Sequence, residues 1–67
     1  MKEKYENDRV ILRRRQVEQR TGLSRSTLYQ YMKDGFFPKP VSLGPRAVGW
    51  IESEVSDWIA TRIRVAR

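Results

Sequence analysis

Apolar and polar positions fall on opposite sides of a helix predicted between residues 25 and 33. Leu28, Tyr31 and Met32 lie three and four residues apart, which is the spacing of a buried helical stripe. The exposed side carries mainly polar residues: Arg25, Ser26, Tyr29, Gln30 and Lys33. The pattern therefore predicts one helix with a core face and an opposite face rich in hydrogen-bond donors.

Signals at both ends bound this helix. Ser24 is placed to accept a hydrogen bond from the backbone N–H groups two or three residues on, as an N-cap does. Gly35 provides a C-terminal stop, and Phe36 is placed to fold back on Tyr31 in a Schellman contact. Pro38 then prevents the helix from continuing.

A shorter helix is predicted before this one, from about Arg14 to Arg20. Gly22 lies between the two helices, where a left-handed backbone is easiest without a Cβ. A short helix, a glycine turn and a serine-capped second helix form the layout of a helix-turn-helix, which aims its second helix at a DNA groove.

Residues 40–51 are predicted to form a β-hairpin, the wing of a winged helix. Residues 44–46 read Gly-Pro-Arg and supply the turn, with Arg46 at the tip. Apolar residues alternate on both arms: Val41 and Leu43 on one, Val48 and Trp50 on the other. Residues 10–12 form a further apolar run, read as either a small strand or a lead-in that packs on the core.

A last helix is predicted to start with Ser53 as its N-cap. Its apolar positions recur at helical spacing and predict a core stripe of Val55, Trp58, Ile59 and Ile63. We assign Trp50 and Trp58 to packing rather than to ligand contacts.

Composition limits the classes of function that remain. The 67 residues contain no cysteine and no histidine, which removes disulfides and the usual zinc ligands. Neither a membrane-spanning run of ~20 apolar residues nor a signal-peptide pattern is seen. We expect one domain over residues 9–67 behind a flexible tail over residues 1–8, in a cytoplasmic, nucleoid-associated protein without metal or cofactor.

The net charge of +6 is concentrated in one part of the chain. Residues 9–46 carry nine basic and two acidic residues, whereas residues 47–67 carry three of each. The excess therefore coincides with the helix-turn-helix and the segment after it, which is typical of a protein with a polyanionic partner. A merely solubilising basic surface is the alternative reading.

The predicted second helix carries side chains suited to reading bases. Arg25 can form a bidentate pair with guanine and Gln30 can do so with adenine. Ser26 and Tyr29 can bond phosphates or bases, and Lys33 is better placed for a phosphate. We also place Ser24, at the start of this helix, in the candidate DNA-binding set.

Further cations flank that helix on either side in the chain. Arg13, Arg14 and Arg15 crowd the start of the first helix, where a phosphate would offset their repulsion with the helix dipole; side chains that simply extend into water are the alternative. We expect Arg46 to contact a minor groove or a phosphate. Lys39, between two prolines, is expected to grip the DNA backbone nearby.

Four segments, taken in order, resemble the AlpA-type prophage regulators. They read GLSRSTLY (22–29), GFFPKPV (35–41), LGPRAVGW (43–50) and ESEVSDWI (52–59). The resemblance covers roughly residues 10–65. It implies a mainly α fold with a small β-hairpin wing: a winged helix-turn-helix of MerR-like or excisionase type. Glu18 and Arg14 depart from the general motif, which favours a small and an apolar residue there.

The resemblance implies a regulator that binds double-stranded DNA and controls integrase or excisionase genes of a prophage or other integrated element. One alternative is an excisionase-like directionality factor that bends attachment-site DNA. A second is an adaptor that contacts an integrase through its wing and last helix. Self-association on repeated sites would add specificity to so small a domain. Catalysis is not expected, because the usual nucleophile–base pairs are missing.

Overall fold

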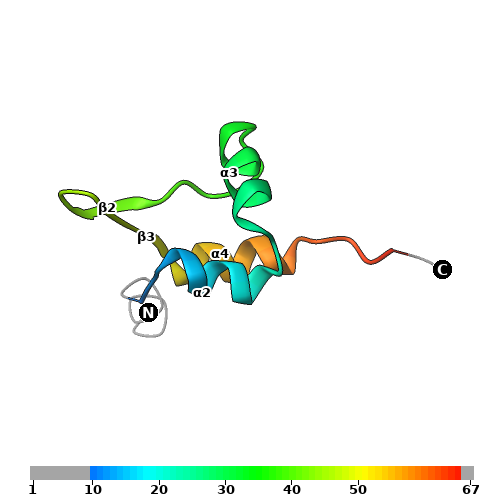
Figure 1. Cartoon of the computed structure of the whole chain (residues 1–67). Helices are drawn as coiled ribbons and strands as arrows, with labels where there is room; N and C mark the ends of the chain where they lie inside the picture. The colour runs from blue at the N-terminus through cyan, green and yellow to red at the C-terminus, as the bar shows by residue number, and fades with distance from the viewer. Residues whose placement is uncertain (1–9, 66–67) are drawn as a thin grey trace.

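The computed structural model describes residues 10–65 (Figure 1). The predicted tail, residue 9 and the last two residues lie outside this part of the chain. The elements follow in the order β1 (Ile11–Leu12), α2 (Arg14–Thr21), α3 (Arg25–Lys33), β2 (Val41–Gly44), β3 (Ala47–Ile51) and α4 (Glu52–Ala60). α2 and α4 lie together in one layer, and α3 and the β2–β3 hairpin project away from it.

The predicted helix-turn-helix is formed by α2, a three-residue turn and α3. Gly22 adopts φ 77° and donates its N–H to Glu18 O at 2.8 Å, which closes α2. Ser24 Oγ accepts from Thr27 N–H at 3.2 Å and so caps α3, as predicted. Because the turn is only three residues long, the end of α2 at Gly22 and the cap of α3 at Ser24 together fix where α3 begins.

The C-terminal end of α3 is the predicted Schellman motif. Gly35 adopts φ 82°, and its N–H donates to Met32 O at 3.2 Å. The N–H of Phe36 donates to Tyr31 O at 2.7 Å, and the two rings meet edge-on with centroids 6.2 Å apart. The chain therefore reverses sharply after α3 and returns toward the hairpin.

The hairpin belongs to a three-stranded antiparallel sheet in the order β1-β3-β2. The apolar run before α2 is thus a strand, with Leu12 opposite Trp50. Gly49 permits this pairing, because a Cβ there would lie 2.3 Å from Ile11 Cγ2 and 3.1 Å from Leu12 O. A register shift between β2 and β3 leaves Leu43 as a bulge near the turn, which the alternation of apolar residues did not predict.

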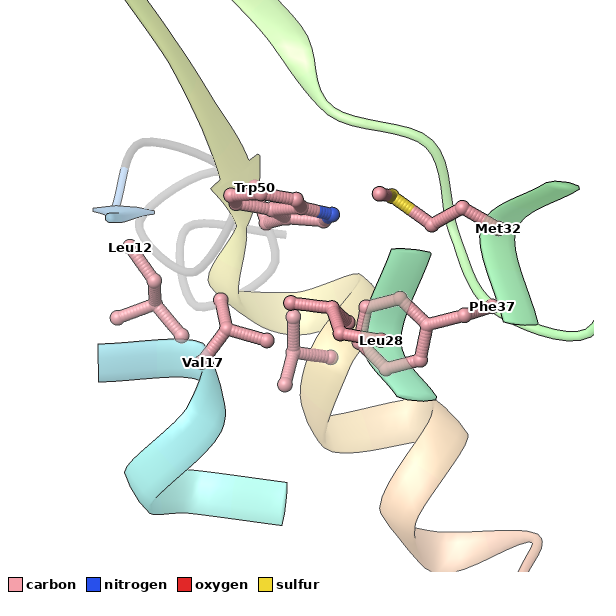
Figure 2. Packing of buried hydrophobic residues seen from close by; sticks show 7 residues of the cluster. Leu12, Val17, Leu28, Met32, Phe37 and Trp50 are labelled. Carbon is pink, nitrogen blue, oxygen red and sulfur yellow. The ribbon is translucent and has the colours of Figure 1, made fainter. Parts of the chain in front are cut away.

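The core centres on Trp50, which is fully buried and reaches from β3 toward the helices (Figure 2). Its indole N–H donates to Pro38 O at 3.1 Å. Trp58 is partly buried and donates its indole N–H to Phe36 O at 2.6 Å. Both tryptophans therefore serve packing, as predicted. The buried cluster consists of Leu12, Val17, Leu28, Met32, Phe37, Trp50 and Val55.

The last helix, α4, begins and ends at other residues than the sequence predicted. α4 begins at Glu52, directly after β3, so the prediction of Ser53 as its N-cap is wrong. The reason is tertiary: the N–H of Glu52 donates to Val10 O at 2.9 Å. α4 ends at Ala60, so Ile63 is outside the helix and 91% exposed, and its assignment to the core stripe is also wrong. Ile59 is 36% exposed and is not packed against the core cluster, so its assignment to the core stripe is wrong as well.

Substitution Gly49→Ala should destabilise the fold, since the added methyl meets Ile11 Cγ2 and the Leu12 carbonyl. We expect a loss of about 1–3 kcal/mol in the free energy of unfolding, measured by urea denaturation. In an Ile11→Ala background, which lacks Cγ2, the same substitution should cost clearly less. Equal costs in both backgrounds would contradict the close approach of β1 to β3.

Candidate nucleic-acid interface

The outer face of α3 is free of contacts with the core. Leu28 and Met32 are buried on the inner face, as the spacing predicted. The predicted polar set is exposed along the other face: Arg25, Ser26, Tyr29, Gln30 and Lys33. α3 can therefore approach another molecule with this face without any rearrangement of the core.

Arg25 interacts with a neighbour on α3, and Gln30 interacts with the C-cap residue of the helix. The Arg25 guanidinium carbon lies 5.9 Å from the centre of the Tyr29 ring, within range of a cation–π interaction. Gln30 Nε2 donates to both carboxylate oxygens of Asp34, at 3.1 and 3.2 Å. The amide of Gln30 is thereby oriented, and a base would have to compete with Asp34 for its donor.

Ser24 is largely committed to the helix cap. Its Oγ accepts from Thr27 N–H and donates to Thr27 Oγ1 at 3.0 Å. The hydroxyl has one remaining lone pair, which a donor can still use but a phosphate cannot. A DNA contact by Ser24 would therefore use its backbone N–H or would break the bond to Thr27.

The start of α2 carries cations and no acidic residue in its first turn. The backbone N–H of Arg13 donates to Gln16 Oε1 at 2.8 Å, and Arg13 itself is the N-cap residue. Arg14 forms an ion pair with Glu18, and both side chains are partly buried. The two departures from the general motif thus compensate each other. Arg15 is exposed and makes no ion pair within residues 10–65.

Arg46 is at the tip of the wing, as predicted, with φ 63°. The left-handed region costs an L-residue roughly 1–2 kcal/mol and is normally left to glycine. Pro45 cannot adopt positive φ, so the second turn residue takes this conformation. The backbone of Arg46 is therefore in a region where glycine would be less strained.

The three basic regions meet around one hollow of about 330 Å³. The start of α2, the exposed face of α3 and the wing each contribute to its wall. We call this the arginine hollow, and its lining residues are Arg13, Arg14, Arg15, Tyr29, Arg46 and Val48. Four arginines separated by up to 33 positions in the sequence thus share one site.

The structure places other predicted residues apart from this hollow. Lys39 lines a different depression beside α4, together with Glu54, Asp57 and Trp58. Arg14 and Arg15 also line a second depression, which extends along α2 to Ser24. Val48 lines the arginine hollow but was not among the predicted site residues, and Arg13 was predicted only as part of the basic cluster at the start of the first helix. Only the tertiary placement of the hairpin brings Val48 there.

No helix within residues 10–65 has the length and apolar character needed to cross a membrane.

A helix-turn-helix followed by a β-hairpin wing on a small three-stranded sheet defines a winged helix-turn-helix protein. Comparison with known proteins gives the particular family. The family described as "Prophage CP4-57 regulatory protein (AlpA)" matches residues 10–63, and the chain belongs to this AlpA family of prophage regulatory proteins.

Two relatives illustrate the similarity. The uncharacterized protein ORF88 of Enterobacteria phage P4 is 50% identical over 53 residues, covering 79% of this chain and 60% of that protein. This chain thus matches less than two thirds of the length of the phage protein. The DNA-binding transcriptional activator AlpA of Escherichia coli strain K12 is 39% identical over a 61-residue alignment, covering 82% of this chain and 87% of the relative.

Replacing Arg46 by glycine should raise the free energy of unfolding by about 1 kcal/mol, because glycine adopts positive φ without a Cβ clash. Urea denaturation measures this gain. Arg46→Ala is the matched control, since alanine removes the charge and retains the strain, and it should give no such gain. Equal stability of the glycine and alanine variants would show that the turn stores no strain at Arg46.

Proposed function

We propose that the chain is a regulator that binds double-stranded DNA and controls genes of a prophage or other integrated element. The observation that carries the proposal is the convergence of arginines from α2 and the wing beside the exposed face of α3. The name of the E. coli relative, a DNA-binding transcriptional activator, supports it. So does membership of a family of regulators rather than enzymes.

In this proposal α3 enters the major groove with its N-terminal half. Arg25 is the first residue of α3 and has the donor geometry for guanine O6 and N7. Gln30 is the candidate for adenine, while Ser26, Tyr29 and Lys33 contact phosphates or flanking bases. The wing then reaches the adjacent minor groove or its phosphates through Arg46.

The regulated genes are proposed to be those of the integrase or excisionase. An excisionase-like role is the second candidate, because the same face could bind and bend attachment-site DNA. A footprint over a promoter favours the regulator, and a footprint over an attachment site favours the recombination factor. If the chain is instead an adaptor, variants that no longer bind duplex DNA should still bind the integrase.

Arg25→Ala should weaken binding to a duplex selected by the wild-type protein by about 5- to 150-fold, and relax preference at one base pair. Fluorescence anisotropy with single-base variants of the duplex measures both effects. Arg62→Ala is the control: it removes the same charge from beyond α4, where the guanidinium stacks 4.1 Å from the Trp58 ring centre. Equal effects of the two variants, with both folded by circular dichroism, would contradict base reading by Arg25.

Affinity should also depend steeply on salt. If six to eight phosphates are neutralised, the logarithm of the association constant should fall against the logarithm of salt concentration with a slope of about −5 to −7. Anisotropy titrations between low and moderate ionic strength provide the slope. An affinity that does not change with salt would remove the electrostatic basis of the proposed function.

A further inference from the structure

We infer that the arginine hollow binds one particular phosphate of the DNA backbone. This is the phosphate of the DNA strand that separates the major groove occupied by α3 from the minor groove reached by the wing. The inference rests on the proposed function and deepens it, since it assigns a ligand group to a hollow rather than to individual side chains.

The first step is geometric. The major and minor grooves of a duplex are separated by a single sugar–phosphate strand. When α3 occupies one groove and the wing the next, that strand has to cross the space between the two elements. Tyr29 of α3 and Arg46 of the wing line the same hollow, so the space between them is continuous. The start of α2 supplies the remaining wall.

The second step is chemical. Neither Arg13, Arg15 nor Arg46 forms an ion pair within residues 10–65. Guanidinium groups hold phosphate oxygens through paired N–H donors, and three such groups around one hollow repel each other until an anion enters. Arg14 differs, because Glu18 already neutralises it. Arg13, Arg15 and Arg46 are therefore the groups that gain most from a bound phosphate.

The apolar part of the hollow fits the sugar. Val48 is 42% exposed and Tyr29 is 43% exposed, although both carry large apolar groups. A deoxyribose beside the bound phosphate would cover these surfaces, while the Tyr29 hydroxyl can donate to a phosphate oxygen. An arginine cluster flanked by a valine and an aromatic ring suits a sugar–phosphate unit better than a base edge.

The test is a double-mutant cycle between protein and DNA. A duplex is first selected from a random pool with the wild-type protein, and its guanines contacted in the major groove are located by methylation interference. Duplexes carrying one methylphosphonate linkage at each position in turn are then titrated. The proteins are the wild type, Arg15→Gln, Arg46→Ala and the control Arg62→Gln.

Replacement of one linkage should weaken binding more than replacement of any other. This linkage should lie between the methylation-sensitive guanines and the minor-groove positions that the wild-type protein, but not Arg46→Ala, protects in a footprint. Its replacement should weaken wild-type binding by roughly tenfold. Arg15→Gln should weaken binding to the unmodified duplex similarly, lower the salt slope by about 1, and be nearly insensitive to that linkage. Arg62→Gln should respond to the linkage as the wild type does.

Two results would overturn the inference in distinguishable ways. If every linkage between the two grooves affects Arg15→Gln as strongly as the wild type, the hollow holds no phosphate, and the proposed function still stands. If the wild-type protein enriches no duplex from the pool, the proposed function fails and the phosphate site fails with it.

Discussion

The buried indole of Trp50 is the contact on which the other elements depend. Its ring lies among side chains from β1, α2 and α3, and its N–H is satisfied by the carbonyl of Pro38 in the segment that leads to the wing (Figure 2). In a chain this short, few large apolar groups are available, and each one buried contributes roughly 1.5–3 kcal/mol. Trp50 is at the inner end of β3, so the same residue holds the base of the wing against α3. The angle between wing and α3, and hence the arginine hollow, follows from this packing.

Two arginines of α2 are neutralised by carboxylates. Arg20 donates to Glu52 Oε2 at 2.9 Å and to Ser56 Oγ at 3.1 Å, and so ties α2 to α4. Arg14 is likewise occupied by Glu18. These pairs are partly exposed and contribute little stability individually. They do, however, neutralise Arg14 and Arg20, whereas Arg13, Arg15 and Arg46 at the hollow have no ion-pair partner within residues 10–65.

Local signals in the sequence were enough to predict the helix-turn-helix and the hairpin. The Ser24 cap, the Gly22 and Gly35 turns and the Gly-Pro-Arg tip each act within a few residues, so their geometry follows from the residue types alone. The end points of α4 could not be predicted in this way. A carbonyl of residue 10 satisfies the first N–H of α4, and this contact spans 42 positions.

In the candidate site, too, only the features that depend on nearby residues could be predicted. The exposed residues of α3 and the tip position of Arg46 were predictable, because helical periodicity and turn chemistry are local. The grouping of four arginines with Tyr29 and Val48 was not, since it depends on how the sheet orients the hairpin against α3. The i,i+4 spacing of Arg14 and Glu18 was a signal in the sequence that would have revealed their pairing.

The two faces of α3 share no residue: Leu28 and Met32 anchor the helix, and the outward side chains touch nothing in the interior. Selection can therefore act on the outward set without disturbing the fold. If α3 reads DNA as proposed, a few substitutions on this face change the sequence that the domain binds. Such variants keep the same buried contacts of Leu28 and Met32.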